Sequence, residues 1–106
     1  MAAYVIAQIE VTNWEKFKAY TQETPATIAK HGGRFLARGA EINVLEGNYP
    51  DKRVVLIEFP SMQKAQEWYH SDEYQRVKAL RQDAATGVLI AVDGLFNHSM
   101  PVEVTH

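Results

Sequence analysis

Glu58 is an acidic residue that directly follows the apolar run 54–57. A buried carboxylate without a partner costs free energy, so Glu58 needs a cationic neighbour or a raised pKa. Arg34 and Arg38 occupy same-face positions of the preceding strand-like segment. Direct pairing of the strand ends places Arg34 opposite Glu58. A bulge near Gly39 would instead bring Arg38 closer, and the sequence leaves both registers open.

The arginine that meets Glu58 supports two interpretations. In the first, the two side chains form a structural ion pair at a strand end. In the second, Arg38 belongs to an anion site, where its fixed fork of donors holds the carboxylate of a substrate.

Aromatic residues recur at helical spacing in the second half of the chain. Trp68, Tyr69 and Tyr74 form a stripe of a kind that usually packs into a core. The polar tips of such residues need partners, and several rings over one sheet face can also wall an apolar pocket. Arg81 lies further along the same segment and could reach the rim of that pocket.

His70 and Ser71 interrupt this stripe and predict a helix break followed by a new N-cap. The break would expose backbone amides at a helix N-terminus, which favours an anion. A Ser-His dyad is only weakly supported, because adjacent residues rarely present both groups in hydrogen-bond geometry. His98 and His106 near the end of the chain are expected to be solvated.

These features predict a small-molecule site between the sheet and the second helical segment, with a small aromatic or aliphatic carboxylate as its ligand. No metal and no cofactor is expected, because metal-ligand spacings, cysteines, phosphate loops and nucleotide fingerprints are all absent. No residue is assigned a catalytic role. The candidate ligand-binding residues are Arg38, Glu58, Trp68, Tyr69, His70, Ser71, Tyr74 and Arg81.

Length and composition restrict the class of protein. The 106 residues suffice for one domain, and the absence of cysteine excludes disulfides and thiolate chemistry. A net charge of −2 with both signs mixed along the chain argues against a nucleic-acid partner. The first apolar run is too short for a signal peptide or a membrane span. We therefore expect a soluble cytoplasmic protein without a membrane partner.

Apolar patterning predicts four strands and two helical regions. The segment 12–15 is typical of a capping box, in which Thr12 caps the first helix. Pro25 is expected to restart that helix with Thr24 as its N-cap. Gly87 is expected to end the second helical region. The strands are expected at residues 3–11, 34–38, 53–59 and 88–92.

Two apolar stripes are expected to face the core. They comprise Trp14, Phe17, Tyr20 and Ile28 in the first helical region, and Ala65, Trp68, Tyr69, Tyr74, Val77, Leu80 and Ala84 in the second.

The order strand-helix-strand-strand-helix-strand predicts a ferredoxin-like α+β fold, with an antiparallel sheet and both helices on one face. The strand segments 4–7, 54–57 and 88–92 are apolar on both faces, whereas a single helix layer covers only one. We therefore expect a second copy of the chain to cover the other face, which makes the protein a homodimer.

Four segments resemble a known family when taken together: 32–39, 45–47, 54–61 and 68–75. They are similar to the domain-of-unknown-function family 1330 (DUF1330), in the dimeric α/β-barrel superfamily. The resemblance implies a ferredoxin-like subunit whose sheet packs face to face on a twin. It also implies relatives such as small monooxygenases, lactone isomerases and haem-handling enzymes, with sites between the sheet and its helices. The family has no settled activity, and shared architecture is no evidence of a reaction.

We expect residues 1–96 to form the single domain and residues 97–106 a C-terminal tail. Three functions stay open. The first is a cofactor-free enzyme, in which a tyrosine or histidine moves a proton and an arginine steadies an anionic substrate. The second is a ligand-binding or stress-response module, and the third is a purely structural dimer. The first two predict a cavity between helices and sheet, whereas the third predicts aromatic side chains that fill this space.

Overall fold

The structure is a computed structural model of the chain, and it describes residues 1–95. The expected tail 97–106, with His98 and His106, lies outside the described residues, so the expected domain boundary stays a prediction. The elements in chain order are β1 (Ala3–Val11), α1 (Trp14–Lys30), β2 (Arg34–Arg38), β3 (Arg53–Phe59), α2 (Met62–His70), α3 (Asp72–Lys78), the short 3-10 helix η1 (Ala79–Arg81) and β4 (Ala85–Asp93).

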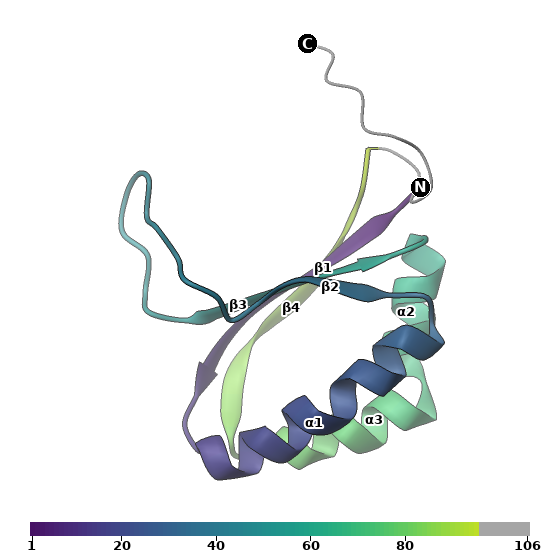
Figure 1. Cartoon of the computed structure of the whole chain (residues 1–106), viewed down its shortest axis with the longest axis horizontal. Coiled ribbons are helices and arrows are strands. Elements are labelled where there is room, and N and C mark those ends of the chain that lie inside the picture. The colour runs from purple at the N-terminus through teal and green to yellow at the C-terminus, as the bar shows by residue number, and fades with distance from the viewer. Residues whose placement is uncertain (96–106) are drawn as a thin grey trace.

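The strands form one antiparallel sheet in the order β2-β3-β1-β4. Helices α1, α2 and α3 all lie on the same side of this sheet (Figure 1). The long connection between β2 and β3 projects away from the rest of the molecule in the same view. This element order and layering confirm the predicted ferredoxin-like α+β fold.

Helix α1 begins later than the capping box predicted. Asn13 is the N-cap, and its side-chain oxygen accepts a hydrogen bond from the backbone N–H of Lys16 at 3.2 Å. Thr12 instead donates its backbone N–H to the carbonyl of Ala84 at 2.8 Å. The prediction of Thr12 as the cap was wrong because the asparagine that follows is an equally good capping residue.

Pro25 lies inside α1 and does not restart it. Proline has no N–H, so the carbonyl of Thr21, four residues earlier, lacks its helical donor. Arg38 supplies a donor instead, because its Nη2 lies 2.5 Å from the Thr21 oxygen. Thr24, the expected cap, is buried in mid-helix and donates its hydroxyl to the Tyr20 carbonyl at 2.6 Å. The predicted restart was wrong because a side chain from β2 replaces the missing bond.

The bulge in β2 lies earlier than predicted. The pairing with β3 shifts between Phe35 and Ala37, so Leu36 is the extra residue. Gly39 has a φ of 66°, a left-handed conformation that favours glycine, and its N–H bonds to a β3 carbonyl at 2.9 Å. Gly39 therefore directly follows the end of the strand, and the residues after it belong to the projecting connection.

Serines begin both pieces of the second helical region, and Ser71 is the new N-cap predicted at the helix break. The Ser61 hydroxyl accepts from the Lys64 N–H at 3.1 Å, and the Ser71 hydroxyl accepts from the Tyr74 N–H at 3.1 Å. Each bond satisfies one of the backbone donors that a helix N-terminus leaves free.

The prediction that Gly87 ends this helical region was wrong. The helical residues end at Arg81, and Gly87 lies inside β4. A Cβ at this position would overlap the backbone oxygen of Gln8 on β1. Gly87 therefore serves the close approach of two strands, a second role that glycine plays in strands.

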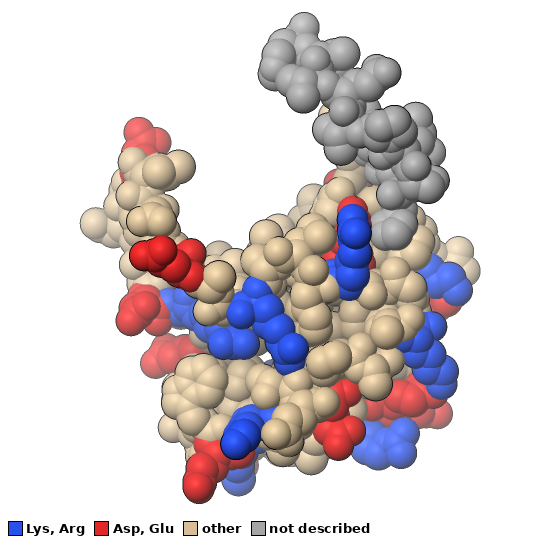
Figure 2. All heavy atoms as spheres, viewed as in Figure 1, with Lys and Arg blue, Asp and Glu red and all other residues tan. Residues whose placement is uncertain are grey.

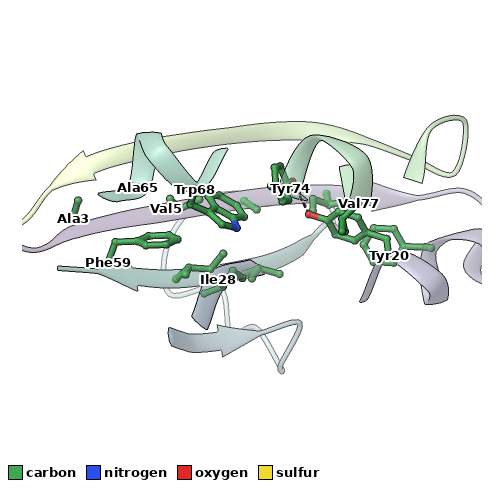
Figure 3. Close-up of a cluster of buried hydrophobic side chains, with 14 of the residues drawn as sticks. Ala3, Val5, Tyr20, Ile28, Phe59, Ala65, Trp68, Tyr74 and Val77 are labelled. Atoms are coloured by element: carbon green, nitrogen blue, oxygen red, sulfur yellow. Dashed lines mark hydrogen bonds between the residues drawn. The ribbon is translucent and has the colours of Figure 1, made fainter. Parts of the chain in front are cut away.

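The core lies between the sheet and the helices, with Trp68 and Tyr74 near its centre (Figure 3). Both rings are almost completely buried, and their centroids are 4.3 Å apart. The Trp68 Nε1 donates to the Thr27 hydroxyl at 3.0 Å. The hydroxyl oxygens of Tyr20 and Tyr74 lie 2.7 Å apart. The buried polar tips of these aromatic residues thus have protein partners.

Two residues expected in the core are exposed. Trp14 is 59% exposed, and its ring packs edge-on against Phe17 at the start of α1. Leu80 is 40% exposed because it lies in η1, where the tighter 3-10 turn breaks the α-helical period on which the prediction rested.

The sheet face opposite the helices is largely apolar and uncovered within residues 1–95. Val88 is 54% exposed and Ile90 is 49% exposed, although both are strand residues. Across the strand pair they lie opposite Gln8 and Ile6 of β1. No helix within these residues is both long and apolar enough to cross a membrane.

Candidate functional site

A cleft of about 430 Å³ opens between the helix layer and β4. It lies between the sheet and the second helical region, where the sequence predicts a site. Its lining residues are Val5 and Ile9 of β1, Ala65, Gln66, Trp68, Tyr69 and His70 of α2, Lys78 of α3, Arg81 of η1, and Gly87, Leu89, Ile90 and Ala91 of β4.

Small residues on β4 contribute to the space of the cleft. Gly87, Leu89 and Ala91 share one side of the strand, because side chains alternate. Leu89 packs against the core from that side, whereas Gly87 and Ala91 offer little or no side chain. The helix-facing side of β4 is therefore incompletely filled beneath α2.

The polar groups of the cleft are basic or neutral. Lys78 Nζ donates to the Tyr69 hydroxyl at 2.8 Å and lies 5.0 Å from the centre of that ring. The His70 ring meets Tyr69 edge-on, with centroids 5.2 Å apart. No Asp or Glu of the described part of the chain lines the cleft. An anion therefore meets attraction here without a competing carboxylate.

Arg81 lies half-buried beside the phenols of Tyr20 and Tyr74. Its guanidinium carbon is 5.3 Å from the centre of the Tyr20 ring. Burial opposes the charge of this side chain, but contacts with Tyr74 and Tyr20 outweigh burial and raise the pKa of Arg81. The Nε atom of Arg81 is buried and has no hydrogen-bond partner within residues 1–95. Arg81 thus brings a permanent charge to the cleft.

Tyr74 and Ser71 stand behind the cleft and do not line it. Tyr74 is completely buried, and burial, with Tyr20 beside it, raises the pKa of the Tyr74 phenol far above its ordinary value. The Ser71 hydroxyl caps α3, so the backbone amide expected to attract an anion already has a partner at Tyr74.

Glu58 lies on the other face of the sheet and is paired with Arg34, which decides the register that the sequence left open. Arg34 is directly opposite Glu58, and Arg34 Nε is 2.7 Å from Glu58 Oε1. The neighbours Ile57 and Phe59 face the core, so Glu58 faces away from the helices and the cleft.

Arg38 lines a second, smaller cavity of about 30 Å³, between α1 and the sheet. Trp68, Ile9 and Leu89 line both cavities and so form the wall between them. The structure therefore brings Trp68, Tyr69, His70 and Arg81 together in one cleft and places Arg38 beyond the Trp68 wall.

Two basic residues that line these cavities are not among the candidate residues predicted from the sequence. Lys78 precedes Arg81 by three residues, and this helical spacing could have indicated that the two share a side. Arg53 stands at the start of β3 and lines the smaller cavity beside Arg38, and this arrangement depends on the bulge at Leu36, which the sequence did not locate. Within residues 1–95, no group of three or more His, Asp or Glu side chains could hold a metal ion.

Comparison with known sequences and structures places the chain in context. The family model described as Domain of unknown function (DUF1330) matches residues 2–95. No curated protein gives a significant match.

Solved structures share the fold at low sequence identity. A protein of unknown function from Rhodopseudomonas palustris is 19% identical, with a TM-score of 0.72 over 90% of this chain and 83% of that one. SnoaB, a cofactor-independent oxygenase from Streptomyces nogalater, is 12% identical, with a TM-score of 0.62 over 93% of this chain and 98% of its own. A dimeric protein of unknown function and ferredoxin-like fold from Bacteroides fragilis is 13% identical, with a TM-score of 0.56 over 88% of this chain and 96% of that one.

Proposed function

The chain belongs to the family described as Domain of unknown function (DUF1330), and from this premise we propose that it binds a small organic carboxylate in the cleft between β4 and the second helical region. The family description assigns no activity, and the support for binding comes from the side chains of the cleft.

The observation that carries the proposal is the unbalanced charge of the cleft. Lys78, Arg81 and His70 line it, and no acidic residue among positions 1–95 does. Arg81 also retains an Nε donor for which the described residues offer no acceptor. A guanidinium matches the oxygens of a carboxylate in planar geometry and forms short, charge-assisted hydrogen bonds. We therefore place the carboxylate of the ligand beside Arg81.

The rest of the cleft favours an apolar body on the same ligand. The Trp68 and Tyr69 rings and the Leu89 side chain provide apolar wall. A volume of about 430 Å³ falls within the usual range of small-molecule sites, about 300–1,000 Å³. Small aromatic and aliphatic acids combine these two properties and are the ligand class that we propose.

A cofactor-free proton transfer in the same cleft is a second candidate function. The Tyr69 hydroxyl beside Lys78 and the exposed His70 imidazole are groups that can donate or accept a proton at a bound ligand. The likeness to a cofactor-independent oxygenase is a likeness of fold, and it agrees with this candidate without assigning it.

Exchange of ligand protons with D₂O separates turnover from binding. An enzyme that moves a proton to or from carbon will exchange the ligand C–H, and Tyr69→Phe will bind the ligand without exchanging it. If the ligand binds but the wild-type protein exchanges nothing, the function is non-catalytic binding.

We also propose that the chain is a homodimer joined through the uncovered face of the sheet. Exposed apolar side chains such as Val88 and Ile90 support this partner, and so does the dimeric description of the Bacteroides fragilis protein. An obligate interface of this kind would bury on the order of 2,000 Å² or more. The cytoplasmic location stays a prediction.

Thermal-shift measurements with benzoate, phenylacetate and hexanoate test the proposed binding. At least one acid should raise the melting temperature, and Arg81→Gln should remove that shift while the dimer persists. Arg76→Gln is the matched control, because Arg76 is exposed on α3 and does not line the cleft. The proposal is wrong if no acid stabilises the protein, or if the Arg81 variant responds as the wild type does.

A further inference from the structure

Arg53 and Arg38 form a pair of cations on the far side of the Trp68 wall, and we call them the arginine pair. Both line the cavity of about 30 Å³. Burial lowers the pKa of Arg53, and repulsion from Arg38 lowers it further. Figure 2 shows basic side chains gathered between the base of the projecting connection and helix α1. The chain thus holds two like charges close together in the lining of one small cavity.

No carboxylate in residues 1–95 forms an ion pair with the arginine pair. Glu10, Glu41 and Asp51 share a surface hollow with Arg53 but lie beyond ion-pair distance. The Nε atom of Arg53 is buried and lacks a hydrogen-bond acceptor among the same residues. A buried donor without an acceptor costs free energy unless water or a ligand supplies one.

The surrounding chain holds both guanidinium groups in place. The Arg38 Nη2 donates to the Thr21 carbonyl, and the guanidinium carbon lies 4.4 Å from the centre of the Phe35 ring. The Arg53 guanidinium passes across Gly39, where a Cβ would overlap it. Its carbon lies 5.8 Å from the centre of the Trp14 ring. These contacts fix the two cations before any ligand arrives, which reduces the entropy lost on binding.

The cavity behind the arginine pair is small and mostly apolar. Ala7, Ile9, Val55, Ile57 and Leu89 are among its lining residues. A volume of about 30 Å³ holds roughly two water-sized groups, because one such group occupies about 10–15 Å³ on this measure. An apolar cavity of this size suits a tail of one or two carbon atoms.

We infer that the arginine pair and this cavity form a second anion site, which takes a short-chain monocarboxylate. The carboxylate lies between the two guanidinium groups and accepts from Arg53 Nε, and the short tail enters the cavity. The inference does not rest on the function proposed for the larger cleft, because it uses different cations on the other side of Trp68.

NMR of the arginine Nε–H groups tests this inference directly on the full-length protein. Sodium propionate is titrated at constant ionic strength, with sodium chloride and inorganic phosphate as the comparison anions. Propionate should shift the Arg53 Nε–H signal saturably, chloride should not, and phosphate should bind more weakly because it has no apolar tail.

Variants separate this site from the cleft. Arg53→Gln should weaken propionate binding, read from the Arg38 Nε–H signal, about tenfold or more, since it removes charge-assisted hydrogen bonds. Arg53→Lys keeps the charge but loses the guanidinium fork, so it should also bind more weakly, and it serves if the glutamine variant does not fold. Arg81→Gln should leave the propionate-induced shift of the Arg53 Nε–H signal unchanged, because that signal reports on the arginine pair and Arg81 lines only the larger cleft. The inference is overturned if the Arg53 signal does not move, if chloride moves it equally, or if both Arg53 variants bind as the wild type does.

Discussion

Arg34 Nε lies 2.7 Å from Glu58 Oε1 across the β2–β3 pair, yet the two side chains differ sharply in exposure. The Arg34 side chain is 65% exposed, whereas that of Glu58 is 10% exposed. The pair therefore stands at the boundary between water and the sheet. Water screens the arginine, so this pair contributes less than a fully buried one.

Glu58→Gln should destabilise the protein by about 1–2 kcal/mol, below the cost of breaking a fully buried pair. The change keeps the shape of the side chain but removes the charge that faces Arg34. Urea unfolding at a fixed protein concentration measures the loss. Glu67→Gln, at an exposed carboxylate paired with Lys64, is the control and should change little. Equal effects of the two substitutions would contradict a special role for the Arg34 pair.

Tyr74→Phe should change how stability depends on alkaline pH. The pKa of Tyr74 is raised in the folded protein, mainly by burial, whereas the pKa of a tyrosine in the unfolded chain is about 10. As the pH rises above that value, the unfolded state loses its proton first, so wild-type stability falls. The stabilising contribution is complete below about pH 10 and is lost as the pH approaches the higher folded value.

The Tyr74→Phe variant should lack this part of the alkaline decline. At neutral pH it should lose about 1 kcal/mol, because the Tyr20 hydroxyl loses its buried partner. Urea unfolding of wild type and variant, from neutral to alkaline pH, measures both the loss of stability at neutral pH and the alkaline decline. Parallel loss of stability in wild type and variant would show that Tyr74 is not responsible.

Gly87→Ala should destabilise the β1–β4 pair, because the added Cβ meets the Gln8 backbone. We expect a loss of about 1–3 kcal/mol, typical of overpacking. Gly47→Ala is the matched control, since nothing lies near an added Cβ there and only its φ of 82° opposes the change. Thermal unfolding of both variants shows which substitution destabilises the protein more. A smaller loss of stability at Gly87 than at Gly47 would contradict the close approach of β4 to β1.

Val88→Glu should convert the proposed dimer into a monomer, because it places a charge on the uncovered sheet face. Val88 does not line the cleft, so the variant should keep its ligand site. Light scattering at micromolar concentration measures the mass. A wild-type monomer, or a Val88→Glu variant that still dimerises, would contradict the proposed interface.

The fold could be predicted because its signals are local. Strand alternation, the caps at Ser61 and Ser71 and the order of elements are all patterns within short segments. The errors at Pro25 and Gly87 have a different cause. In each case a residue distant in sequence decides the structure: Arg38 restores the bond that Pro25 removes, and Gln8 on β1 requires the glycine in β4.

The site could be predicted only in part for the same reason. Trp68, Tyr69, His70 and Arg81 all belong to the second helical region, so their spacing in the sequence indicated a shared cleft. Arg53 comes to Arg38 because the bulge at Leu36 turns Arg38 to the face of the sheet that Arg53 shares, and no local pattern located this bulge.

A crystal structure of the protein with the most stabilising aromatic or aliphatic acid is the most direct test of the proposed function. We expect the carboxylate within hydrogen-bond distance of Arg81, with the apolar body of the ligand against Trp68 and Tyr69. Ligand density elsewhere on the chain, or a carboxylate directed away from Arg81 and Lys78, would contradict it.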